Sequence, residues 1–136
     1  MSLLRQIWQK SGGFWLDVLP SALYCAILFW AGLIPLHSLP GPDFELKDKV
    51  WHALAFGGLA GLFSRALKHW GRAPLPAARD AALVAIALGG VLEVLQGFTP
   101  YRSPDVADFI ADAMGAVLAY GTLRALEASP VPQGAE

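Results

Sequence analysis

Charged side chains are scarce in this chain, and their scarcity excludes most classes of soluble protein. Asp, Glu, Lys and Arg make up 15% of the sequence, against roughly 25% in ordinary soluble domains. A soluble domain of 136 residues exposes much of its surface and needs more charge than this to cover it. The net charge of −1 also leaves no basic footprint, so no nucleic-acid partner is expected.

Cysteines and phosphate-binding motifs are also nearly absent. Cys25 is the single cysteine, which excludes an intramolecular disulfide, and it lies in an apolar run that suits a small packed residue. The run GGLAG at 57–61 lies inside an apolar segment, where close helix packing explains its glycines better than a phosphate does. A kinase or a nucleotide-dependent dehydrogenase is therefore excluded, and neither a cofactor nor a resident metal is expected.

Long apolar segments are what the chain has in abundance. Residues 18–36 carry no charge at all, and a bilayer needs about 20 such residues per helix. The segments are apolar around most of their circumference and rich in Ala and Leu, which favours buried or lipid-facing helices over strands. We predict an all-α fold, an integral membrane four-helix bundle. One domain covers 1–127, with spans at about 17–36, 49–68, 80–99 and 104–124, and a disordered tail follows at 128–136.

The positive charges between these spans are unevenly distributed. Three of them fall on one side of the predicted bundle, namely Lys47, Lys49 and Arg102. The other seven fall on the opposite side: Arg5, Lys10, Arg65, Lys68, Arg72, Arg79 and Arg124. Because short cytoplasmic loops carry the excess of Lys and Arg, both termini are predicted to be cytoplasmic.

Polar residues gather at the outer end of the predicted helices. Asp105, Asp108 and Asp112 follow one helical stripe. Glu93 reaches a depth similar to that of Asp112, where a carboxylate facing lipid would cost several kcal/mol, so both should face inward. We predict one outward-opening pocket with these candidate catalytic residues: Asp48, Lys49, His52, Glu93, Gln96, Arg102, Asp105, Asp108 and Asp112.

A purely structural role for these residues is the competing interpretation. Polar side chains in membrane bundles can simply fasten helices together. Asp48 and Asp105 also stand where helices begin, and an acid is favourable there as a cap.

Two segments carry a family resemblance. The two stretches are DKVWHALAFGGLAGL and GGVLEVLQGFTPYRSPDVADFIADAMGAVLAY. The region of about 48–120 that contains them resembles the VanZ-like family of small bacterial membrane proteins. The shared pattern is Asp-Lys-x-x-His, Glu-x-x-Gln, an Arg and an Asp-rich helix that ends in Gly. The family often has Asn where this chain has Asp112. The resemblance implies a multi-pass protein of the bacterial cytoplasmic (inner) membrane, a link to low-level teicoplanin resistance, and no established reaction.

The preferred functional hypothesis is binding or modification of an anionic amphiphile of the cell envelope, such as a lipid-linked cell-wall intermediate. Lys49 and Arg102 can hold an anionic group. A proton could then move through Glu93, Asp108 or His52.

Two alternatives remain. His52, Glu93, Asp108 and Asp112 could ligate a divalent ion. Alternatively, the chain could be a non-catalytic membrane assembly partner in which the polar residues form a structural network. The oligomeric state is not predicted.

Overall fold

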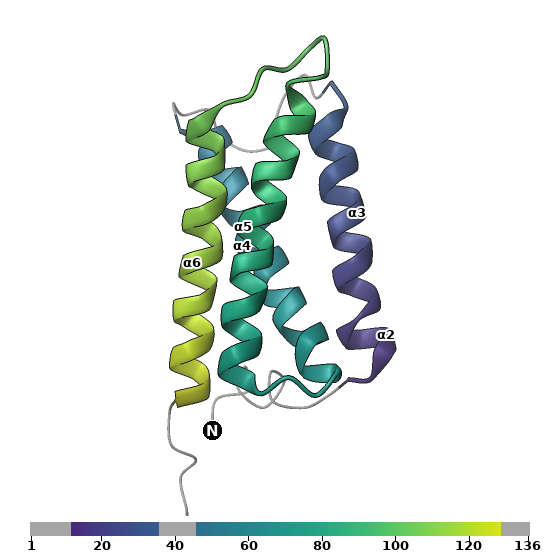
Figure 1. Cartoon of the computed structure of the whole chain (residues 1–136), viewed down its shortest axis with the longest axis vertical. Helices are drawn as coiled ribbons and strands as arrows, with labels where there is room; N and C mark the ends of the chain where they lie inside the picture. Colours follow the sequence, from purple (N-terminus) through teal and green to yellow (C-terminus); the bar gives the residue numbers. More distant parts are fainter. Residues whose placement is uncertain (1–11, 36–45, 129–136) are drawn as a thin grey trace, which may run out of the picture.

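The computed structural model describes residues 12–35 and 46–128, and these residues form helices and connections without a strand. The elements are α2 (Phe14–Asp17), α3 (Leu19–Leu33), α4 (Lys47–His69), α5 (Pro74–Gln96) and α6 (Val106–Ala128). The long helices run up and down beside one another (Figure 1). The prediction of an all-α fold with four long helices is confirmed. The predicted tail lies outside the described residues from 129 onward, as do Arg5 and Lys10.

The first predicted span is a helix with a break near its start. Pro20 lies in the first turn of α3, and its ring leaves it no N–H to continue the hydrogen-bond ladder from α2. The chain turns at Val18 and then resumes a helical course. Together α2 and α3 cover Phe14–Leu33, 20 residues that are apolar enough to cross a membrane.

The connection between α4 and α5 is tighter than the sequence indicated. Gly71 has φ +84°, a conformation that glycine adopts without strain. The N–H of Gly71 donates to the carbonyl oxygen of Lys68, and the N–H of Arg72 donates to the carbonyl oxygen of Leu67. These two bonds satisfy carbonyl groups at the end of α4. Pro74 then opens α5, a position where a missing N–H costs nothing. Residues 74–79, which precede the predicted span at about 80–99, are therefore helical as well.

The surface of the bundle is that of a membrane protein. Besides Phe14–Leu33, α4 and α6 are long and apolar enough to span a membrane. Large apolar side chains such as Trp30, Leu54 and Leu118 are more than half exposed, and such a surface suits lipid. α5 is as long as α4 and α6, at 23 residues, but it is the most enclosed helix, with nine buried residues.

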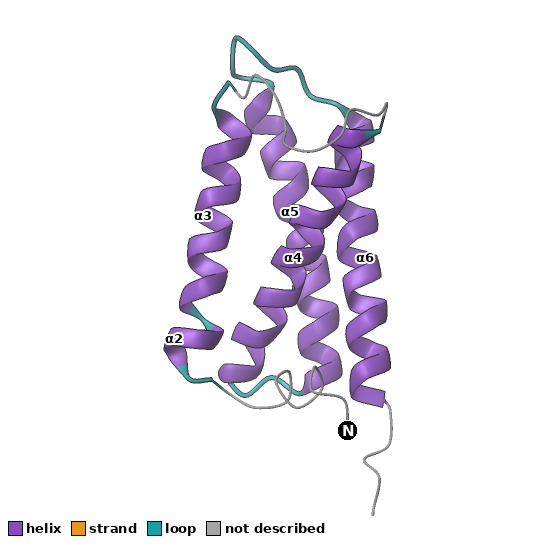
Figure 2. Ribbon diagram, turned by 180° about the vertical axis from the view of Figure 1, so that it is seen from behind, coloured by secondary structure: helices purple, strands orange, loops and turns teal. Residues whose placement is uncertain are grey.

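The tight packing lies between α4, α5 and α6, and α3 lies against α4 and α5 on one side (Figure 2). Small residues make the close approach possible. A Cβ on Gly115 would collide with the backbone of Ala53, and one on Gly57 would come within 3.0 Å of the Gly115 carbonyl oxygen. The α4–α6 crossing therefore depends on glycine. Gly61, in the run whose glycines were explained by close helix packing, instead faces open space.

Candidate functional site

The nine predicted site residues all lie at the end of the bundle that carries the 97–105 connection (Figure 1). We call this the loop end. The first two turns of α4 and of α6, the last turn of α5 and the connection itself supply them. The structure thus brings the nine residues to one end, although they form a network and two separate hollows rather than one shared cavity.

Lys49 is the centre of an ion-pair network. Its Nζ donates a hydrogen bond of 2.7 Å to Asp105 Oδ2 and a second one to Asp108 Oδ1. Asp48 Oδ2 lies 3.7 Å from the same nitrogen. The hydrogen bond from Lys49 holds the pKa of the Asp105 carboxyl below its usual range. Lys49 is therefore engaged by acids of the protein, which differs from the expectation that it holds an anionic ligand.

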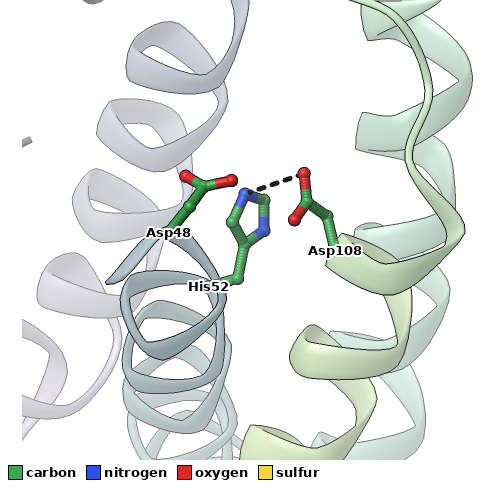
Figure 3. Close-up of side chains that lie close together, drawn as sticks. All are labelled: Asp48, His52 and Asp108. Atoms are coloured by element: carbon green, nitrogen blue, oxygen red, sulfur yellow. Dashed lines mark ion pairs between the residues drawn. The ribbon is translucent and has the colours of Figure 1, made fainter. Parts of the chain in front are cut away.

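His52 lies between carboxylates from two helices. Its ring stands between Asp48 and Asp108, which come from α4 and α6 (Figure 3). Nε2 is 3.6 Å from Asp108 Oδ2, and Nδ1 is 2.9 Å from Asp112 Oδ1. Because both ring nitrogens face acids, the ring is fixed in orientation and each nitrogen has a carboxylate to share a proton with.

Asp105 and Glu93 connect α5 to the start of α6. The Asp105 N–H donates to Glu93 Oε2 at 2.8 Å. Asp105 Oδ1 in turn accepts from the N–H of Ala107 at 2.8 Å, which is the bond of an N-terminal helix cap. The capping role considered for Asp105 is therefore real, and it coexists with the ion pair to Lys49.

Gln96 has a fastening role. Its Nε2 donates a hydrogen bond of 2.9 Å to the carbonyl oxygen of Gly32, at the end of α3. The Tyr101 hydroxyl donates to the neighbouring Leu33 carbonyl at 2.8 Å, and that of Tyr24 donates to the Ala55 carbonyl at 3.0 Å. These three bonds hold the otherwise lightly packed α3 to the rest of the bundle.

An apolar groove of about 250 Å³ opens between α3, α4 and α5 at the loop end. Its walls include Leu28, Phe56 and Leu92, and four of the predicted site residues complete its lining: Asp48, His52, Gln96 and Arg102. Glu93 and Asp105 line a separate hollow on the α5–α6 side. Arg102 forms no hydrogen bond or ion pair with any residue in the described ranges.

A second group of buried charges, which was not predicted from the sequence, lies at the opposite end of the bundle. Asp17 is 3% exposed, and its Oδ1 accepts from Arg65 Nη2 at 2.5 Å. Asp17 Oδ2 accepts from the Gly12 N–H at 2.9 Å and lies 3.8 Å from His69 Nδ1. An acid placed just before an apolar span, with a cation at the same depth in the next span, was the available signal.

Three of the long helices in the described residues are apolar enough to span a membrane, and the bundle carries a cluster of buried charges at the loop end. These features define a small integral membrane protein with a polar site. The family model of VanZ/LLP1 matches residues 6–127. The chain belongs to the VanZ/LLP1 family, and the resemblance seen in the sequence is confirmed. Comparisons with curated proteins and with solved structures give no match.

Proposed function

We propose that the loop-end groove binds an anionic amphiphile of the bacterial cell envelope. The apolar chain would lie in the groove between α3, α4 and α5, and the charged head group would meet Arg102. The observation that carries this proposal is an arginine with no partner in 12–35 or 46–128, on the lining of a largely apolar groove. An unpaired guanidinium beside apolar walls suits a ligand that has both characters.

The groove is accessible from the lipid phase. Ile27 and Trp51 belong to its lining and are 61% and 40% exposed. In a membrane these side chains face acyl chains, so a lipid can enter sideways without leaving the bilayer. A volume of about 250 Å³ is at the small end for a ligand site, which suits a head group and the first part of its chain.

The charges favour a phosphate next to a sugar. Arg102 can form the two-pronged hydrogen bond that phosphate oxygens accept, whereas Lys49 is already engaged by Asp105 and Asp108. Asp48 lines the same groove, and its carboxylate can accept hydrogen bonds from hydroxyl groups. A lipid-linked cell-wall intermediate combines an isoprenoid chain, phosphate and sugar, so it is the ligand class that we propose.

His52 is the group that could move a proton if the ligand is modified. It lines the groove, and its two ring nitrogens face Asp108 and Asp112, so a proton taken up by the ring can be shared with a carboxylate. We further propose that the protein resides in the bacterial cytoplasmic membrane and that its groove faces outward. Capture of the ligand would then contribute to teicoplanin tolerance.

Binding can be tested with purified protein in detergent micelles and a radiolabelled polyisoprenyl phosphate. We expect saturable binding that falls at least tenfold in Arg102→Gln and partly in Arg102→Lys, because lysine keeps the charge but loses the fork. The matched control is Arg72→Gln, an exposed arginine at the opposite end that pairs with Asp80, and it should bind as wild type. Polyisoprenol without phosphate should not compete.

Equal binding by wild type and Arg102→Gln would refute the head-group assignment. Competition by phosphatidylglycerol as strong as that by the polyisoprenyl phosphate would refute the ligand class.

The tolerance proposal has its own test in cells. Arg102→Lys and Glu93→Gln should reach the membrane in normal amounts and abolish any teicoplanin tolerance that the intact protein confers. Tolerance retained by both variants would favour the alternative, a non-catalytic assembly partner whose polar network only holds helices together.

A further inference from the structure

Two oxygens in the interior of the site have no hydrogen-bond partner among the residues that the structure describes. They are Glu93 Oε1 and Asp112 Oδ2, on side chains that are 7% and 0% exposed. Leaving a buried polar atom unpaired costs about 1–3 kcal/mol, and more for a charged group. Two such atoms on carboxylates from neighbouring helices indicate a missing partner of opposite charge.

The two carboxylates and His52 have the spacing of metal ligands. One ligand atom from each of His52, Glu93 and Asp112 can be chosen so that all three lie within 4.8 Å of one another. Ligands of one zinc ion lie within roughly 4.4 Å of each other, twice the metal–ligand distance. Rotations of the two carboxylates can therefore close the site. Gly89 leaves room beside it, since a Cβ there would stand 2.9 Å from Asp112 Oδ2.

The neighbouring groups support a cation at these three residues rather than one turn higher. Asp48, His52 and Asp108 also satisfy the spacing, but Lys49 donates a hydrogen bond to Asp108 and lies close to Asp48. A lysine ammonium already occupies that place and would repel a second cation. The deeper trio is free of this competition within the described residues.

We propose that His52, Glu93 and Asp112 bind one divalent transition-metal ion, Zn²⁺ or Mn²⁺. One imidazole nitrogen and two carboxylates form a mixed donor set that both ions accept. Ca²⁺ requires six to eight oxygens, which this trio does not supply. With Nδ1 of His52 on the metal, Nε2 faces Asp108, and a carboxylate behind a metal-binding histidine is the usual means of fixing its ring. Lys49, which also donates to Asp105, then holds Asp108 in place.

The test uses the full-length protein in detergent, stripped with a chelator and titrated with Zn²⁺ or Mn²⁺ alone by calorimetry. We expect one site per chain for at least one of the two ions, and an affinity reduced at least tenfold in Asp112→Asn and in Glu93→Gln. Asp80→Asn removes an acid at the opposite end of the bundle and should bind as wild type. Absence of binding to wild type, or wild-type affinity in Asp112→Asn and Glu93→Gln, overturns the proposal.

A second measurement does not depend on the folding of variants. Zinc-edge X-ray absorption of the loaded wild-type protein should show only nitrogen and oxygen neighbours at about 2.0–2.2 Å. A sulfur neighbour would assign the ion to Cys25 or a methionine and overturn the proposal. Because the metal alone is the probe, failure here leaves the amphiphile proposal standing, and failure of lipid binding leaves this one standing.

Discussion

Replacing Arg65 with Met should destabilise the bundle by about 3 kcal/mol, because the buried carboxylate of Asp17 loses the guanidinium with which it pairs. Removing one partner of a buried ion pair costs about 3–5 kcal/mol. Asp17 would keep the Gly12 N–H on Oδ2, and His69 at 3.8 Å could supply part of the missing positive charge. Both effects place the expected cost at the lower end of the range.

The double replacement separates the ion pair from simple packing. Asp17→Leu combined with Arg65→Met removes both charges and leaves apolar groups of similar size, a change that is often neutral or stabilising. We expect the double variant within about 1 kcal/mol of wild type, which is a recovery of roughly 2 kcal/mol relative to Arg65→Met. Arg72→Met is the matched control, since its exposed pair with Asp80 should contribute less than about 1 kcal/mol.

The assay is reversible unfolding in mixed detergent micelles, followed by tryptophan fluorescence. A loss below about 1 kcal/mol in Arg65→Met would show that Asp17 is solvated or protonated when alone, contrary to its burial. A double variant as unstable as Arg65→Met would show that Arg65 acts through its packing and not through its charge.

Three further predictions concern the α4–α6 crossing, the loop end and the orientation in the membrane. Gly115→Ala should cost about 1–3 kcal/mol in the same unfolding assay because the added methyl meets the α4 backbone, whereas Gly121→Ala, with open space around it, should be neutral; equal effects would contradict the tight crossing. Asp105→Asn should destabilise at neutral pH. The pKa of Asp105 is lowered in the folded state, so its contribution is present above the unfolded value of about 3.9 and is lost as the pH falls through the folded value. A difference from wild type that does not shrink as the solution is made more acidic than the unfolded value would disprove this. Cysteine at Ser103 should react with an impermeant thiol reagent from outside intact cells and cysteine at Ala73 should not, and the reverse labelling would invert the proposed orientation.

The helices and the gathering of the polar residues were predictable because both follow from period and length. A helix of bilayer length has one position along the membrane normal, so the depth of Glu93 or Asp112 can be calculated from its distance to the nearest proline-bounded turn. The start of α5 was less accessible, since prolines end a helix as readily as they begin one. Only the structure shows that Pro74 begins one.

The partners of the charges could not be read from the sequence. Pairing depends on how each helix is rotated, and segments that are apolar all round specify rotation weakly. Lys49 and Arg102 therefore looked equivalent. Three acids surround Lys49, whereas Arg102 lines the groove and pairs with none of the described residues. The same limitation hid the Arg65–Asp17 pair, whose members lie 48 residues apart.

Gly115 has no side chain to offer a ligand, yet it sets the width of the site. The hydrogen bond between His52 and Asp112 spans α4 and α6 one helical turn from the place where Gly115 lets the two backbones nearly touch. Grafting the nine polar residues onto another helical bundle would therefore fail to reproduce the site unless the helix spacing were transferred as well. The geometry of the polar site therefore depends in part on a residue that has no functional group.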